Sequence, residues 1–240
     1  MENFYLSVPS SKFKEKPVKQ NSEIFFVPIS HEIEQAVPYL ENHWKMQDNK
    51  NDKLTDSVVY NAQTFSEVED FYERNPKGEF TYLAHRWYNK RTSTVTEDIF
   101  CSYNIARREK DIKHKTIDFY IMDIPFDLKL TGFPKKFGKQ RSDYSSDRTY
   151  RNDLIRWLYE NQSKGRRNHD KNRIFVVCKH DDGLNSRNNL LLKKDFTQID
   201  QKVKLFLDYS YSKLEQGEDP FNKVTLNNGT TVYSEVIFIY

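Results

Sequence analysis

Residues 117–131 read IDFYIMDIPFDLKLT, and this stretch decides the fold that we expect for the chain. In its second half, apolar side chains stand at positions 124, 126, 128 and 130, and polar ones at 127, 129 and 131. In its first half, apolar residues at 117, 119 and 121 alternate with Asp118 and Tyr120. Successive side chains of a strand point to opposite faces. The pattern therefore predicts two strands, residues 116–121 and 124–131, each with one apolar face.

A turn at Met122 and Asp123 would join these strands into a hairpin. Residue 121 would then pair with 124 and residue 119 with 126, so that Asp118 falls directly opposite Asp127. One face of this hairpin is apolar, and the other brings two carboxylates together with the ammonium group of Lys129. A four-residue turn keeps these faces and shifts the register, whereas a three-residue turn separates the carboxylates. We interpret Asp123 as a turn former rather than a ligand.

Two carboxylates that face each other across a hairpin, at about 5 Å, repel each other. A cation bound between them removes this cost, and hard oxygen donors without thiols suit Mg²⁺ or Mn²⁺. Such an ion activates water and stabilises charge on a phosphate. Lys129 lies two residues from Asp127 on the same face, where it can position that water or neutralise developing negative charge. The alternative is a solvated outer face of the hairpin with an ordinary Asp–Lys pair.

This arrangement resembles the PD-(D/E)xK nucleases, whose signature is an acid on one strand and acid-x-Lys on the next. The resemblance places the first acid on Asp118 and the triplet on Asp127-Leu128-Lys129. It implies that Asp118 and Asp127 bind the metal, that the Leu128 carbonyl adds a ligand, and that Lys129 is catalytic. Two features depart from the usual pattern: no proline precedes Asp118, and the second acid is Asp rather than the commoner Glu.

The resemblance covers roughly residues 91–180 and implies a restriction-endonuclease-like core of the α/β (α+β) class. Such a core has the order α-β-β-β-α-β, with a mixed central sheet flanked by helices, and one of its three successive strands is not evident in the sequence. We expect a mainly helical N-terminal region over residues 1–90, the nuclease core over 91–216, and a C-terminal β-hairpin over 217–240 that turns at Asn227-Asn228-Gly229.

Hydrophobic periodicity predicts the remaining elements. The expected helices cover residues 31–47, 65–74, 80–87, 95–108, 150–161 and 195–214. Short strands are expected at residues 23–28 and, as a buried apolar run, at 173–179. The polar segment 46–56 is expected to be an exposed loop.

Members of this family often add an acid from the helix that precedes the first catalytic strand, and Glu97 is our candidate for it. An equally good interpretation makes Thr94 and Glu97 a capping box at the start of a helix. Asp98 and Asp111 are weaker alternatives to Glu97 as a metal ligand.

Two basic clusters flank the expected site. The first contains Lys135, Lys136, Lys139 and Arg141, and the second contains Lys164, Arg166, Arg167, Lys171 and Arg173. We favour phosphate contacts for them, above all for Lys135, Lys136, Arg166 and Arg167. The alternative is a set of solvated surface charges, which is usual for such runs.

The composition is that of a globular protein, with 37% hydrophobic, 30% charged and 15% aromatic residues and a net charge of +3. We expect no secretory signal and no membrane span, and we expect two buried thiols at Cys101 and Cys178; together these favour the cytoplasm. No glycine-rich phosphate loop is present, so we expect no nucleotide cofactor.

The leading hypothesis is a nuclease that uses Mg²⁺ or Mn²⁺ to hydrolyse phosphodiester bonds in DNA, as a possible homodimer. By resemblance alone, such a nuclease would act in restriction or phage defence. A second hypothesis is a catalytically inactive protein of the same fold that binds nucleic acid or a partner protein. A third, an interaction protein of unrelated fold, predicts that Asp118 and Asp127 lie far apart.

Overall fold

In the part of the chain that the computed structural model describes, six strands form one open sheet in the order β1-β2-β3-β4-β6-β5. The described residues are 13, 15–20, 27–40, 49–76, 78–111, 114, 116–161, 170–180 and 186–240. The strands are β1 (Ala106–Arg108), β2 (Phe119–Ile121), β3 (Ile124–Gly132), β4 (Arg173–Cys178), β5 (Lys223–Thr225) and β6 (Thr231–Ile239). β3, β4 and β6 run parallel, whereas β1–β2, β2–β3 and β5–β6 pair antiparallel. The expected mixed sheet is confirmed.

The hairpin of β2 and β3 has the predicted turn and register. Ile121 pairs with Ile124, and Phe119 pairs with Phe126. Met122 and Asp123 have φ of 48° and 63°, so both central residues adopt the left-handed conformation that a two-residue hairpin turn requires. Met is an unusual choice there, but its side chain is only 1% exposed and belongs to the core, which offsets the backbone cost.

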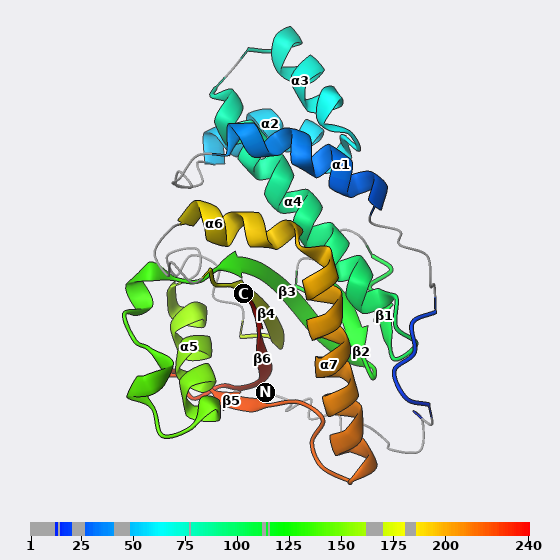
Figure 1. The fold of residues 1–240 in the computed structure, drawn as a ribbon, viewed down its shortest axis with the longest axis vertical. Helices are drawn as coiled ribbons and strands as arrows, with labels where there is room; N and C mark the ends of the chain where they lie inside the picture. The colour runs from blue at the N-terminus through cyan, green and yellow to red at the C-terminus, as the bar shows by residue number, and fades with distance from the viewer. Residues whose placement is uncertain are drawn as a thin grey trace.

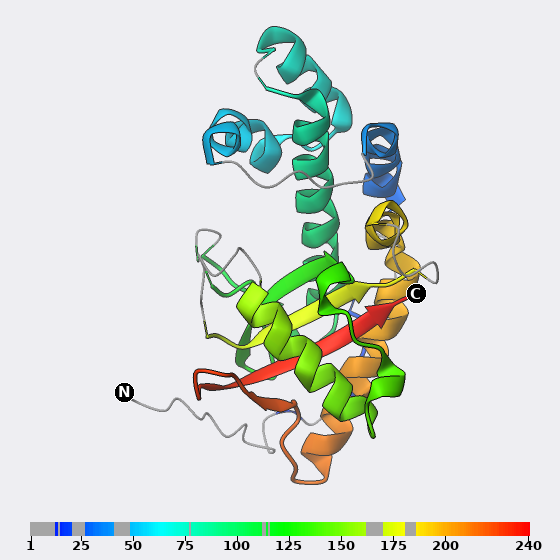
Figure 2. The same cartoon turned by 90° about the vertical axis from the view of Figure 1, so that its left-hand side faces the viewer.

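Helices cover both faces of the sheet. They are α1 (Val27–Ala36), α2 (Asn49–Asn61), α3 (Phe65–Arg74), α4 (Phe80–Cys101), α5 (Asp147–Asn161), α6 (Ser186–Leu191) and α7 (Phe196–Glu215). Short 3-10 turns lie at Val37–Tyr39, Lys135–Phe137, Arg141–Asp143 and Leu192–Lys194. α5 covers one face of the sheet, α7 and the end of α4 cover the other, and α1, α2 and α3 surround the far half of α4 (Figures 1 and 2).

Each face of the sheet has its own core. Phe126, Leu128 and Ile174 belong to a large cluster that includes buried side chains of α4 and α7. Phe175 and Val177 of β4 point to the opposite face of the sheet. They belong to a second cluster that includes residues of α5. All six residues of β4 are buried, as the apolar run predicted for a central strand.

α4 is one continuous helix of 22 residues, whereas two separate helices were predicted over 80–87 and 95–108. Both predictions were wrong in extent: the helix does not stop at 87, and residues 106–108 form β1. No glycine or proline interrupts residues 80–101, so nothing in the local sequence ends the helix earlier. α4 spans the expected boundary at residue 90 and connects the helical region to the sheet (Figure 1).

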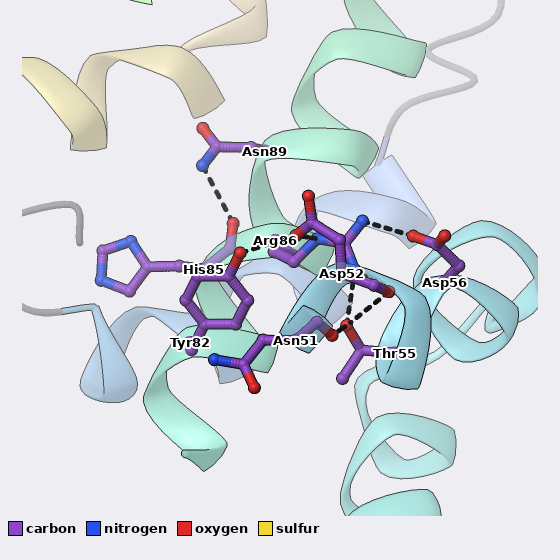
Figure 3. Close-up of polar contacts among 8 residues, drawn as sticks. All are labelled: Asn51, Asp52, Thr55, Asp56, Tyr82, His85, Arg86 and Asn89. Carbon is purple, nitrogen blue, oxygen red and sulfur yellow. Dashed lines mark hydrogen bonds and ion pairs between the residues drawn. The ribbon is translucent and has the colours of Figure 1, made fainter. Parts of the chain in front are cut away.

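The predicted loop over 46–56 is also wrong for its described part, because residues 49–56 begin α2. Buried Arg86 of α4 explains this helix (Figure 3): its guanidinium donates to the Asp52 carbonyl (2.9 Å) and to Asp56 Oδ1 (2.6 Å). Tyr82 donates to Asp52 Oδ1 (2.6 Å), and Thr55 Oγ1 accepts from Arg86 (2.5 Å). Asp52, Thr55 and Asp56 therefore bond α4, while Lys53 and Ser57 of the same helix are exposed.

The other predicted elements agree with the structure to different degrees. The helices over 65–74, 150–161 and 195–214 correspond to α3, α5 and α7, the strand over 173–179 to β4, and the C-terminal hairpin to β5 and β6. The helix predicted over 31–47 corresponds to α1, which ends at Ala36, and residues 41–48 lie outside the described part. Residues 23–26 of the strand predicted over 23–28 also lie outside the described part, and Val27 begins α1. None of the described helices is both long and apolar enough to cross a membrane.

We predict that Asp123→Val lowers the stability of the protein by about 1–2 kcal/mol. This is the cost of placing a residue with a Cβ atom, and without a polar side chain that bonds locally, in the left-handed conformation. Asp123→Gly adopts φ of 63° freely and serves as the matched control. Urea unfolding of the three proteins measures both effects. Equal stability of the Val and Gly variants would contradict the two-residue turn and hence the register of the hairpin.

Candidate functional site

Asp127 of β3 is buried, and both of its carboxylate oxygens accept bonds from cations. Lys129 Nζ donates to Oδ1 and Arg173 Nε donates to Oδ2, each at 2.5 Å. Arg173 stands directly beside Asp127 in the parallel register of β3 and β4, and its guanidinium lies over the Tyr159 ring, 4.9 Å from the centroid. We expected Arg173 to contact phosphates as part of a basic cluster; it is instead buried against Asp127.

Asp118 lies immediately before β2 and next to Asp127. Its amide donates to the Phe126 carbonyl (2.9 Å), and its Oδ2 accepts from the Leu128 amide (2.6 Å). The described ladder ends at Phe119, so the carboxylate of Asp118 takes the place of a strand partner for Leu128. Asp118 and Asp127 are thus neighbours, so the separation of these acids that the third hypothesis predicts is wrong.

Glu97 lies within α4, where it is 8% exposed. The helix begins at Phe80, so Thr94 is an internal residue and the capping-box interpretation was wrong. Glu97 Oε2 accepts from Arg108 Nη1 (2.7 Å), and Arg108 also pairs with Asp98. Glu97 is thus paired with Arg108, and it lies close enough to Asp118 for the charge of that carboxylate to act on it.

The charge of Asp118 disfavours ionisation of Glu97, and the charge of Asp127 disfavours ionisation of Asp118. Burial raises the pKa of Glu97 above its ordinary value, and the charge of Asp118 raises it further, against the effect of Lys90 and Arg108. Burial also raises the pKa of Asp118, as does Asp127, while the Leu128 amide and the charges of Lys129 and Lys90 act in the opposite direction. A cation bound beside Asp118 and Glu97 would counter the burial and repulsion that disfavour their charged forms.

The position of Lys129 tests whether the site suits a metal. Its Nζ bonds both Asp127 Oδ1 (2.5 Å) and the Leu128 carbonyl oxygen (3.2 Å), the two ligands that the resemblance assigns on β3. A cation is therefore accommodated between these oxygens, which are hard donors of the kind that Mg²⁺ and Mn²⁺ prefer. Among the described residues, no three Asp, Glu, His or Cys side chains converge as a ready metal centre. A divalent ion on Asp127 would have to displace Lys129, whose side chain is 39% exposed, rather than buried Arg173.

The expected phosphate-binding residues lie in different places. Lys135 and Lys136 are exposed in the 3-10 turn that follows β3. Arg166 and Arg167 lie outside the described residues, as does Lys164. The other members of the first cluster form surface ion pairs, Lys139 with Asp153 and Arg141 with Asp147. Surface charge is thus the better description of Lys139 and Arg141.

Comparisons with known proteins add no family assignment. No family model, no curated protein and no solved structure matches the chain. The geometry of the site is therefore the basis for a functional proposal.

We predict that Glu97→Gln raises the stability of the protein at pH 7. A raised folded-state pKa means that Glu97 destabilises the fold once ionised, and that this effect is absent below the unfolded pKa. The advantage of the Gln variant should therefore shrink as the pH falls from 7 toward the ordinary range of Glu. Thermal unfolding against pH measures it; each kcal/mol gained raises the melting temperature by about 2–4 °C.

Exposed Glu73 provides the control, because Glu73→Gln removes the same charge from the surface of α3. A lower melting temperature for Glu97→Gln at pH 7 would show that the bond to Arg108 outweighs the effect of burial.

Proposed function

We propose that the chain is a metal-dependent nuclease of the PD-(D/E)xK type that hydrolyses phosphodiester bonds in DNA. One observation carries the proposal. The ammonium group of Lys129 already lies between Asp127 Oδ1 and the Leu128 carbonyl oxygen, next to Asp118. An acid before one strand and acid-x-Lys on the next are brought together by a buried hairpin, as the signature requires.

The order of the elements supports the same proposal. Within the described chain, α4, β1, β2, β3, α5 and β4 follow one another as α-β-β-β-α-β, the order of the restriction-endonuclease-like core. The strand that the sequence did not reveal is β1, which pairs with β2 at the edge of the sheet. Fold order alone does not establish activity, so the proposal depends on the site.

Each residue of the site has a role in this proposal. Asp118, Asp127, the Leu128 carbonyl and Glu97 would hold Mg²⁺ or Mn²⁺, which when bound supplies an activated water and stabilises charge on phosphate. Lys129, released from Asp127, orients that water and neutralises negative charge that develops on the phosphate. Arg173 positions Asp127 from the neighbouring strand.

A second candidate function is binding of nucleic acid or a partner protein by an inactive protein of this fold. It is favoured by one observation: both oxygens of Asp127 already have cationic partners. A role in restriction or phage defence, action in the cytoplasm and a homodimer that cuts both strands extend the first candidate by resemblance only.

Incubation with supercoiled plasmid tests catalysis. We expect nicking or cutting by the parent protein only with Mg²⁺ or Mn²⁺, and loss of at least about a hundredfold in rate for both Lys129→Ala and Asp127→Asn. The first variant lacks the ammonium that would face the reacting phosphate, and the second lacks a charged ligand of the metal. Lys204→Ala, on the exposed face of α7, is the control. A Lys129→Ala protein that cuts as fast as the parent would refute the role of Lys129.

Thermal unfolding with and without Mg²⁺ separates the two candidates. A metal that binds only the folded protein stabilises it by about 2.7 kcal/mol at a concentration of 100 times Kd. We expect Mg²⁺ to raise the melting temperature of the parent and of Lys129→Ala, in which the position between Asp127 and Leu128 is vacant. We expect no such rise for Asp127→Asn. Absence of any Mg²⁺-dependent rise in the parent would favour the inactive candidate.

A further inference from the structure

A cleft of about 640 Å³ adjoins the acidic site. It is lined by the C-terminal half of β3 and by residues of α2, α4 and α6 and of the segments that follow β3 and α6. We call it the β3–α6 cleft. It lies at the carboxyl end of β3, one of the parallel strands, and this is the edge of an α/β sheet at which ligands commonly bind.

The lining of this cleft is strongly basic. Five cationic side chains line it, namely Arg86, Lys90, Lys129, Lys135 and Lys193, and its lining includes no Asp or Glu. Arg86 is neutralised by Asp52 and Asp56 of α2, and Lys129 by Asp127. Lys90, Lys135 and Lys193 remain as the source of a net positive potential. An anion is therefore the ligand that the cleft would attract.

Lys193 is the most informative of these side chains, because it is buried at 8% exposure without a carboxylate partner among the described residues. Its Nζ donates to Asn89 Oδ1 (2.6 Å). Asn89 Nδ2 in turn donates to the His85 carbonyl (3.0 Å; Figure 3), which fixes the orientation of the amide. Burial lowers the pKa of Lys193 to about 8, so the ammonium remains mostly charged at pH 7.

Within the part of the chain that the structure describes, the partner of this buried ammonium is a neutral amide, so the ammonium retains donors that a phosphate can accept. Burying such a charge without a counter-ion is costly, and an anionic ligand would remove the cost. A purely structural bond from Lys193 to Asn89 would not require the surrounding lining to be basic.

Two other lysines connect the cleft with the acidic site. Lys129 lines the cleft and bonds Asp127. Lys90 of α4 also lines the cleft, and its charge acts on both Glu97 and Asp118. A strand whose scissile phosphate lay at the acids could therefore extend into the cleft.

We propose that the β3–α6 cleft binds a backbone phosphate of the nucleic-acid strand next to the scissile one, with Lys90, Lys135 and Lys193 as its cationic contacts. The identity of the ligand rests on the proposed nuclease function. The chemistry is that of charge-assisted bonds from ammonium groups to phosphate oxygens, which position a strand without reading its sequence.

Fluorescence anisotropy with a labelled DNA duplex, in EDTA so that no cleavage occurs, tests the proposal. We expect Lys193→Met to raise Kd about tenfold, the effect of losing one bond between charged groups. The dependence of log K on log salt concentration should become shallower by about 0.9 for the lost contact. Lys135→Met, at an exposed position of the same cleft, should weaken binding without affecting the core.

Lys204→Met removes the same charge from the exposed surface of α7 and is the matched control, expected to bind like the parent. Thermal unfolding supplies a readout that separates the roles of Lys193. For a ligand-binding Lys193, the Met variant should be at least as stable as the parent while it binds less tightly. A Met variant of lower stability and unchanged Kd would overturn the proposal in favour of a structural role.

Two further outcomes keep this proposal distinct from the nuclease itself. Suppose that the parent cleaves DNA with metal, and that the parent, Lys193→Met and Lys135→Met bind DNA with equal Kd. This result would refute phosphate binding by the cleft and would still support the nuclease activity. Lys193-dependent DNA binding without cleavage would support the cleft and refute the nuclease. Titration with inorganic phosphate separates the sources of the anion: phosphate binding that depends on Lys193, with DNA binding that does not, would overturn the assignment to nucleic acid.

Discussion

The register of the β2–β3 hairpin is the constraint on which the site depends. A slip of one residue would move Asp127 of β3 to the apolar face and expose Phe126 and Leu128. The two left-handed residues of the turn prevent that slip, and the burial of Met122 stabilises the turn. Because β4 continues the sheet in parallel register, the same constraint sets Arg173 beside Asp127.

The charges of the site are balanced locally rather than across the molecule. Lys129 and Arg173 bond the carboxylate of Asp127, while Arg108 bonds Glu97. Among the described residues, no cationic side chain bonds the carboxylate of Asp118. The Leu128 amide stabilises this carboxylate instead. Burial still raises the pKa of Asp118, so the group retains an unfavourable charge that lowers stability. Natural proteins commonly tolerate such a cost where a site must bind a ligand.

Much of the sheet could be predicted from the sequence, because strict alternation in residues 117–131 and the apolar run of β4 are local patterns. The position of Arg173 could not, because its neighbour Asp127 is 46 residues away and only the parallel pairing brings them together. α2 was mistaken for a loop since its polar residues bond buried Arg86 of α4, a contact between segments about 30 residues apart. Strand β1 is only three residues long, too short for a pattern. Glu97 was a candidate from the sequence, yet the continuity of α4, which buries Glu97 inside a helix, could not be read from it.

The acidic site and the β3–α6 cleft lie next to each other because β3 contributes to both. Its side chains alternate between core and site, while its C-terminal half extends past the end of β2 and lines the cleft. α4 has the same double role, with Glu97 at the acids and Lys90 and Asn89 at the cleft. A fold kept only for its shape would gain stability from an apolar side chain in place of buried Lys193. Negative charge on one side of Lys129 and positive charge on the other are what a site needs when it must hold both a cation and a polyanion.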